Sequence, residues 1–126
     1  MKILVIDDSV TMRRIFVNAL NRIGYCDTVE ACDGEEALAL FDASIDLIAT
    51  DWNMPHMTGT EFTRAVRARA DGHDVPILMV TTRSVRADIL EAVKAGVNNY
   101  VLKPFTPAIL KEKIEQMLPA PTTKVA

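Results

Sequence analysis

The chain has 126 residues, of which 49% are hydrophobic and 25% are charged, a balance typical of a single globular domain. Its formal net charge of -3 gives no electrostatic reason to expect binding to nucleic acid. No apolar run approaches the roughly 20 residues that cross a bilayer, and the short apolar stretch after Met1-Lys2 lacks the features of a signal peptide. We therefore expect a cytoplasmic protein without membrane insertion.

The cysteines and histidines do not have the spacing of metal ligands. Cys26 and Cys32 form no C-x-x-C pair, and we expect both to be buried free thiols in a reducing compartment. His56 and His73 fall in predicted loops, and two isolated histidines do not make a zinc site. Metal chemistry, if any, has to come from carboxylates.

Strand-like and helix-like segments alternate along the chain. Short apolar runs predict strands at residues 2–6, 28–31, 45–51, 75–80 and 99–102. A helical pattern takes over from Ser9, and helix N-caps are predicted at Asp33, Thr58, Ser84 and Thr106. Five strand–helix repeats favour an α/β fold, a doubly wound parallel sheet with right-handed crossovers and helices on both faces. We expect this domain to span residues 1–118, followed by a flexible tail at residues 119–126.

The helical segments also carry apolar stripes that predict their buried faces. The first stripe contains Val10, Ile15, Ala19 and Ile23, and the second contains Ala37, Leu38, Leu40 and Phe41. The remaining three contain Phe62, Ala65 and Val66; Val85, Ile89, Leu90 and Val93; and Ile109, Leu110, Ile114, Met117 and Leu118.

Polar residues follow four of the predicted strands, and all four strand ends should lie at one edge of a parallel sheet. Asp7 and Asp8 follow the first strand, Asp51 ends the third, Thr81 follows the fourth and Lys103 follows the fifth. Three neighbouring carboxylates need a compensating charge, which Mg²⁺ can supply through oxygen ligands. A lysine and a hydroxyl beside them favour phosphoryl chemistry. Each residue alone has an ordinary interpretation, such as a turn former or a solvated surface charge.

Four segments carry a resemblance to a known family. Val5–Ser9, Thr50–Pro55, Met79–Thr81 and Tyr100–Phe105 together resemble the receiver domain of two-component response regulators, from the first strand through the last helix. The sequence Asp-Trp-Asn-Met-Pro is most similar to that of the chemotaxis regulators. The resemblance implies a flavodoxin-like fold with strand order 2-1-3-4-5.

The resemblance also implies a role for each residue at the sheet edge. Asp51 would accept a phosphoryl group from the phosphohistidine of a kinase. Asp8, Asp51 and the backbone carbonyl of Asn53 would bind Mg²⁺ directly, and Asp7 would bind it through water. Thr81 and Lys103 would contact the phosphoryl oxygens.

Further implications concern the neighbourhood of this site and the signal that it sends. Lys103-Pro104 would be a cis peptide, and Asn53 and Arg83 would tune the lifetime of the acyl phosphate. When Thr81 moves toward the phosphoryl group, Tyr100 would turn inward; alternatively, it is a static aromatic residue on an edge strand. The switch surface would lie on the fourth helix, fifth strand and fifth helix, framed by Tyr100, Ile89, Phe105 and Lys113.

The implied protein is a monomeric switch rather than an enzyme, with self-catalysed phosphoryl transfer and autodephosphorylation. Its partners would be a sensor histidine kinase or phosphotransfer protein and a downstream target, such as the flagellar motor switch. Alternatively, it relays or drains phosphate, or belongs to a longer regulator with an output domain.

Two other functions fit the sequence less well. A haloacid-dehalogenase-type phosphatase would need an acid at position 53, which is Asn53, and a cap for which 126 residues leave little room. A nucleotide- or flavin-binding module would need a glycine-rich loop where Asp7-Asp8-Ser9 stands.

Overall fold

The computed structural model describes residues 1–82 and 86–118, so Arg83, the Ser84 cap, Val85 and the predicted tail lie outside the described residues. The elements are β1 (Lys2–Ile6), α1 (Val10–Arg22), β2 (Asp27–Ala31), α2 (Gly34–Leu40), β3 (Leu47–Asp51), α3 (Gly59–Arg67), the 3-10 turn η1 (Ala70–Gly72), β4 (Ile77–Thr81), α4 (Arg86–Ala95), β5 (Asn99–Leu102) and α5 (Pro107–Met117). The predicted alternation of strands and helices is confirmed.

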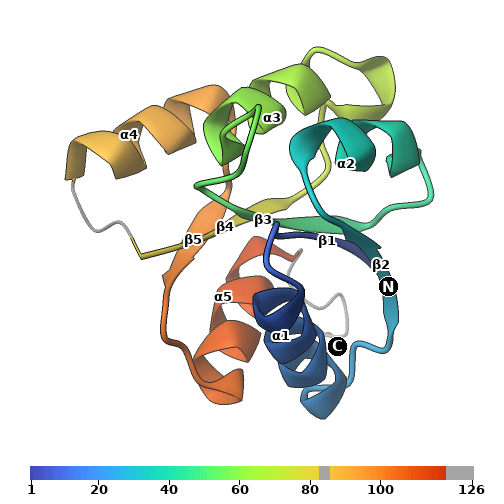
Figure 1. The fold of residues 1–126 in the computed structure, drawn as a ribbon, viewed down its shortest axis with the longest axis vertical. Helices are drawn as coiled ribbons and strands as arrows, with labels where there is room; N and C mark the ends of the chain where they lie inside the picture. The colour runs from blue at the N-terminus through green and yellow to red at the C-terminus, as the bar shows by residue number, and fades with distance from the viewer. Residues whose placement is uncertain (83–85, 119–126) are drawn as a thin grey trace, which may run out of the picture.

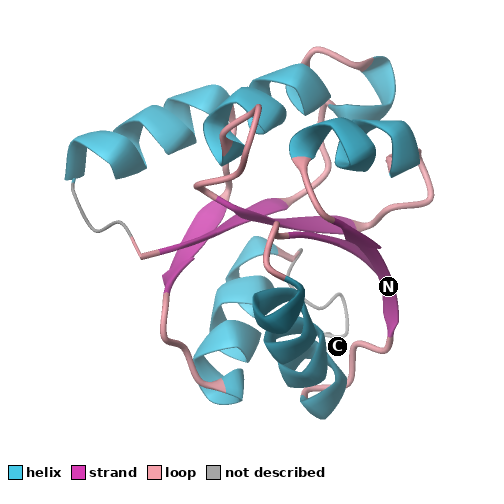
Figure 2. Cartoon of the chain, in the orientation of Figure 1, coloured by secondary structure: helices cyan, strands magenta, loops and turns pink. Residues whose placement is uncertain are grey.

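The five strands form one parallel sheet in the order β2-β1-β3-β4-β5, as the resemblance implied. Helices α1 and α5 cover one face of the sheet, and α2, α3 and α4 cover the other (Figures 1 and 2). Each face has its own buried cluster, with Phe62 and Val66 in one and Phe16 and Leu20 in the other. The sheet therefore lies between two layers of helices, which explains why β3 and β4 consist of nearly continuous apolar residues.

Two strands start later than the sequence predicts. The backbone N–H of Ile45 donates to Asp42 O and closes a turn, so β3 begins at Leu47. Pro76 has no N–H to donate, and β4 begins at Ile77. Strand β3 ends at Asp51 as predicted, whereas β4 ends one residue later than predicted, which makes Thr81 a strand residue.

Several predicted buried stripes are wrong because the helices are rotated relative to them. On α1, Val10 is 59% exposed and Ile15 is 49% exposed, while Phe16 and Leu20 are buried beside the correctly predicted Ala19. The exposed residues on other predicted stripes are Leu40, Leu90, Val93 and Ile109. On α4 the small residues Ala92 and Ala95 face inward instead, because small side chains allow the helix to approach the sheet closely.

The predicted caps at Asp33, Thr58 and Thr106 each accept the expected backbone hydrogen bond, and Ser9 also caps its helix. A complete capping box forms at Thr58. At Asp33 the box is incomplete, because Glu36 accepts from the N–H of Cys32 instead.

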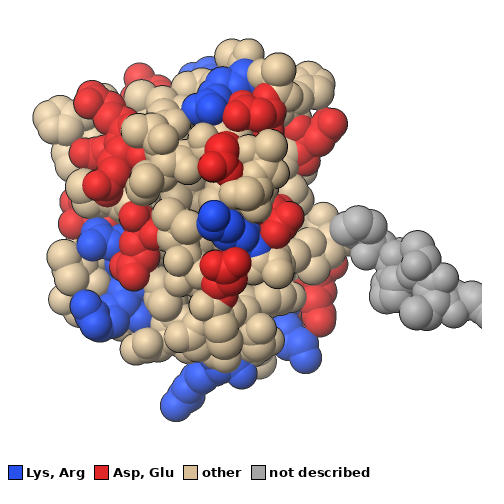
Figure 3. All heavy atoms as spheres, turned by 90° about the vertical axis from the view of Figure 1, so that its right-hand side faces the viewer, with Lys and Arg blue, Asp and Glu red and all other residues tan. Residues whose placement is uncertain are grey.

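The expectation of buried thiols is wrong, since Cys26 and Cys32 are both exposed. Among the described residues, no helix is long and apolar enough to span a membrane. The face beside β2 mixes acidic and basic side chains, with no continuous patch of one sign (Figure 3).

Candidate functional site

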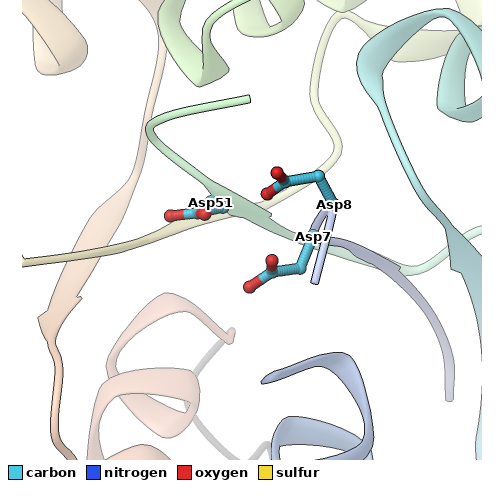
Figure 4. A group of neighbouring side chains, drawn as sticks. All are labelled: Asp7, Asp8 and Asp51. Atoms are coloured by element: carbon cyan, nitrogen blue, oxygen red, sulfur yellow. The ribbon is translucent and has the colours of Figure 1, made fainter. Parts of the chain in front are cut away.

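Three carboxylates meet at the carboxyl edge of the sheet. Asp7 and Asp8 continue directly from β1, and Asp51 is the last residue of the neighbouring strand β3. One carboxylate oxygen from each lies within 4.8 Å of the others. In Figure 4 the three side chains converge from these two adjacent strands. The sequence prediction of a shared acidic site is therefore realised in space.

A single ammonium group bridges two of these carboxylates. Lys103 follows β5, and its Nζ lies 3.3 Å from Asp51 Oδ1 and 3.4 Å from Asp7 Oδ2. Its backbone N–H donates to Thr81 O, and the Lys103-Pro104 peptide is cis, as the resemblance implied. The lysine side chain is only 13% exposed, so its contacts with the carboxylates are weakly screened by solvent.

The electrostatics of Asp51 are those of a partly buried anion with incomplete compensation. Burial raises the pKa of Asp51 above its ordinary value, the Lys103 ammonium lowers it, and the nearby Asp7 raises it again. Three carboxylates against one ammonium leave a local excess of negative charge. A hard divalent cation with oxygen ligands, such as Mg²⁺, fits this set of donors.

The two aspartates after β1 are held very differently. Asp7 is buried, and its Oδ1 accepts from the backbone N–H of Ser9 while its Oδ2 contacts Lys103. Asp8 is exposed, and within residues 1–82 and 86–118 no hydrogen bond or ion pair restrains its carboxylate. Asp8 is therefore free to turn toward a ligand, whereas both oxygens of Asp7 are already engaged.

The remaining predicted site residues are on segments next to this cluster in the fold. Thr81 is buried at the end of β4, next to Leu102 in the register, and Asn53 is exposed in the loop after β3. Sequence reasoning missed Gly59, where an added Cβ would collide with the backbone oxygen of Asp51. Its only signal was a glycine directly after the predicted cap Thr58. The loop that shapes the site thus needs a residue without a side chain at this position.

The four residues predicted to frame the switch surface do not all lie together. Tyr100 and Ile89 line one apolar cavity between α4 and the sheet, which Thr81 also lines. Lys113 on α5 places its Nζ 5.3 Å from the centre of the Tyr100 ring. Phe105 instead packs under α1, with its ring centroid 5.4 Å from that of Phe16. Tyr100 therefore lies near both Ile89 and Lys113, whereas Phe105 packs into the cluster between α1, α5 and the sheet, on the other side of the sheet from Ile89.

Comparisons with known proteins agree with this geometry. The chain is 51% identical over 120 residues to the chemotaxis protein CheY1 of Helicobacter pylori, covering 94% of this chain and 97% of the relative. It is 52% identical over 118 residues to the chemotaxis protein CheY of Pseudomonas aeruginosa, covering 93% and 95%.

Solved structures give the same result. CheY4 of Vibrio cholerae matches with a TM-score of 0.85 and 38% identity, covering 93% of this chain and 98% of that one. The receiver domain of a Pseudomonas aeruginosa sensor histidine kinase, which has a magnesium ion coordinated in its active site cleft, matches with a TM-score of 0.81 and 28% identity, covering 92% and 95%. The profile of the response regulator receiver domain matches residues 3–115, and the chain therefore belongs to the receiver-domain family of response regulators, with CheY chemotaxis proteins among its relatives.

Proposed function

We propose that this receiver domain is a phosphorylation switch in which Asp51 accepts a phosphoryl group from the phosphohistidine of a kinase or phosphotransfer protein. The observation that carries the proposal is the position of Asp51, at the tip of a central strand, in contact with Lys103 and beside two further carboxylates. An Asp51 oxygen attacks the phosphorus, the phosphorus–nitrogen bond breaks, and the histidine nitrogen leaves. The product is an acyl phosphate on Asp51.

Each neighbouring residue has a defined task in this proposal. The Lys103 ammonium favours the ionised, nucleophilic form of Asp51 and afterwards contacts a phosphoryl oxygen. The Thr81 hydroxyl donates a hydrogen bond to another phosphoryl oxygen. Asp8, Asp51 and the Asn53 backbone carbonyl would hold Mg²⁺, and Asp7 would act through water. The ion supplies positive charge that offsets the repulsion between the carboxylates and an incoming phosphoryl group.

The output surface of the switch is the face formed by α4, β5 and α5. It carries large apolar side chains that are 40–54% exposed, namely Leu90, Val93, Leu102 and Ile109. Exposed apolar groups on neighbouring elements are typical of a surface that binds a partner protein. Thr81, the predicted phosphoryl contact, and Tyr100 line the same cavity beneath α4, which supports transmission from the site to this face. The names of the relatives favour a downstream partner in chemotaxis, and relay or storage of phosphate is the alternative role.

The test of the phosphorylation site uses acetyl phosphate with Mg²⁺ and intact-mass measurement. The parent protein should gain one phosphoryl group, and Asp51→Asn should gain none. Asp74→Asn, which alters an exposed loop aspartate, is the matched control and should be labelled like the parent. Labelling of Asp51→Asn at the parental rate would refute the proposal.

The test of the output surface uses the phosphoryl analogue beryllofluoride and NMR. Signals from Ile89, Tyr100 and Lys113 should shift together with those of the site. Thr81→Ala should still be labelled at Asp51 but should transmit a smaller shift to Tyr100. Tyr100→Trp should alter partner affinity while labelling stays unchanged. Shifts confined to the carboxylate edge would place the output surface elsewhere.

A further inference from the structure

Arg13 on α1 lies directly behind the acidic site and contacts two other elements. Its Nη1 donates to the backbone oxygen of Asp7 at 2.7 Å, and its Nε donates to Glu30 Oε1 on β2 at 3.1 Å. The Arg13 side chain is 15% exposed, whereas Glu30 is 48% exposed. The guanidinium therefore spans from the edge strand of the sheet to the loop that carries the two aspartates.

This contact acts on a peptide group that also determines where Asp8 lies. The carbonyl oxygen of Asp7, the nitrogen of Asp8 and the Cα of Asp8 share one plane, because the peptide bond is rigid. Fixing the Asp7 oxygen therefore fixes the direction in which the backbone of Asp8 leaves β1. On the other side of Asp7, its N–H donates to Ala31 O on β2 at 3.2 Å.

Asp8 needs such backbone support more than its neighbours do. Lys103 contacts the side chains of Asp7 and Asp51, and the Ser9 N–H also restrains Asp7. The Asp8 carboxylate has none of these restraints, so only its backbone determines how close it lies to the other two. A ligand whose own side chain is unrestrained pays an entropic cost when it binds a metal, and a fixed backbone reduces that cost.

We propose that Arg13 is a positioning residue for the metal site: it fixes the Asp7–Asp8 peptide plane so that Asp8 stays within reach of a divalent cation shared with Asp51, and Glu30 holds Arg13 in place. This inference rests on the proposed function of the acidic cluster as a Mg²⁺ site. A guanidinium suits the task because its planar fork binds two acceptors at once, which a lysine ammonium on a flexible stem does not reproduce.

The competing explanation is that Arg13 acts only as a nearby positive charge. The two explanations predict opposite effects for Arg13→Met, because removal of a charge alone should strengthen Mg²⁺ binding. Loss of positioning should instead weaken it. Arg13→Lys separates them further, since it keeps the charge and removes the fork.

The experiment is a Mg²⁺ titration of the unphosphorylated protein, followed by the fluorescence of Trp52, which adjoins Asp51. Arg13→Lys should weaken Mg²⁺ binding about tenfold, as is common for groups that orient a metal ligand. Glu30→Gln should weaken it less, because a neutral acceptor still holds Arg13. Arg14→Lys, an exposed position on the same helix, should bind as the parent does.

A second control excludes a general loss of stability. Ile114→Val alters the buried core under α5, away from the acidic cluster, and should lower the melting temperature without changing Mg²⁺ affinity. Parental affinity in Arg13→Lys, or tighter binding in Arg13→Met, would overturn the inference. A parent protein that binds no Mg²⁺ at all would instead refute the proposed function.

Discussion

Charged side chains at the carboxyl ends of the strands and at their amino ends differ in how well they are paired. At the carboxyl edge, Asp7, Asp8 and Asp51 crowd together with one lysine between them. At the other edge, the guanidinium of Arg67 on α3 donates to the backbone oxygens of Gly72 and Gly96 and to Asn98 Oδ1. At the carboxyl edge, three carboxylates share a single ammonium group. At the opposite edge, a single guanidinium has three acceptors.

The carboxylate cluster is suited to function, whereas the Arg67 cluster stabilises the fold. Arg67, at the end of α3, binds η1 through Gly72 and the end of α4 through Gly96. It also donates to the side-chain oxygen of Asn98, and the same oxygen accepts from the Ile77 N–H at the start of β4. At the acidic edge, the mutual repulsion of the carboxylates opposes folding and becomes useful only when a cation or phosphoryl group arrives. Proteins commonly tolerate such local conflict at functional sites.

The largest effect on stability should come from breaking the satisfied edge. Arg67→Met removes hydrogen bonds to three acceptors and leaves partly buried carbonyl groups without a donor. We expect a loss of about 2–3 kcal/mol in the free energy of unfolding, from the cost of unsatisfied buried polar groups. Urea denaturation measures the loss. Mg²⁺ affinity should stay unchanged, and a variant that loses both would show that the two edges are coupled.

The second effect concerns metal binding at the acidic edge. Asp8→Asn exchanges a direct carboxylate ligand for a neutral, weaker one, so Mg²⁺ affinity should fall by at least about tenfold. Asp7→Asn should cause a smaller fall, because Asp7 acts through water. Calorimetric titration with MgCl₂ gives both affinities. Equal affinities in the parent and Asp8→Asn would remove Asp8 from the metal site.

The third effect is a gain in stability with a defined pH dependence. Because the pKa of Asp51 is raised in the folded state, its ionised form disfavours folding at neutral pH, and this penalty disappears as pH falls through that pKa. Asp51→Asn should therefore melt a few degrees higher than the parent at pH 7 without Mg²⁺. The difference should shrink in acid. An advantage that grows as pH falls would show that the carboxylate is stabilised, not strained.

The smallest effect should come from an ion pair far from either edge cluster. Arg64 on α3 lies 3.7 Å from Glu91 on α4, and both side chains are more than half exposed. Exposed pairs of this kind contribute about 0–1 kcal/mol. Glu91→Gln should change the melting temperature little and leave Mg²⁺ affinity as in the parent. A large loss would mean that the α3–α4 contact depends on charge rather than on packing.

The sequence alone determined the order of the elements, the helix caps and the residues that reach the carboxyl edge. These follow from local chemistry: apolar runs form buried strands, Asp33 and Thr58 supply oxygen atoms to helix N-termini, and parallel strands bring their ends to one edge. The family resemblance added the strand order, which no local pattern contains.

Only the tertiary structure decided which side of each helix faces the sheet. Ile15 is apolar and spaced four and eight residues from Ala19 and Ile23, as in a buried stripe, yet it is exposed. Helix α1 turns Phe16 and Leu20 inward instead, because those side chains fill the space between α1, α5 and the sheet. The same holds for Arg13 and Arg67, whose acceptors include Glu30 and Gly96 on distant segments of the chain. Spacing along one helix reveals which residues share a face, whereas the partner of that face depends on how separate segments pack together.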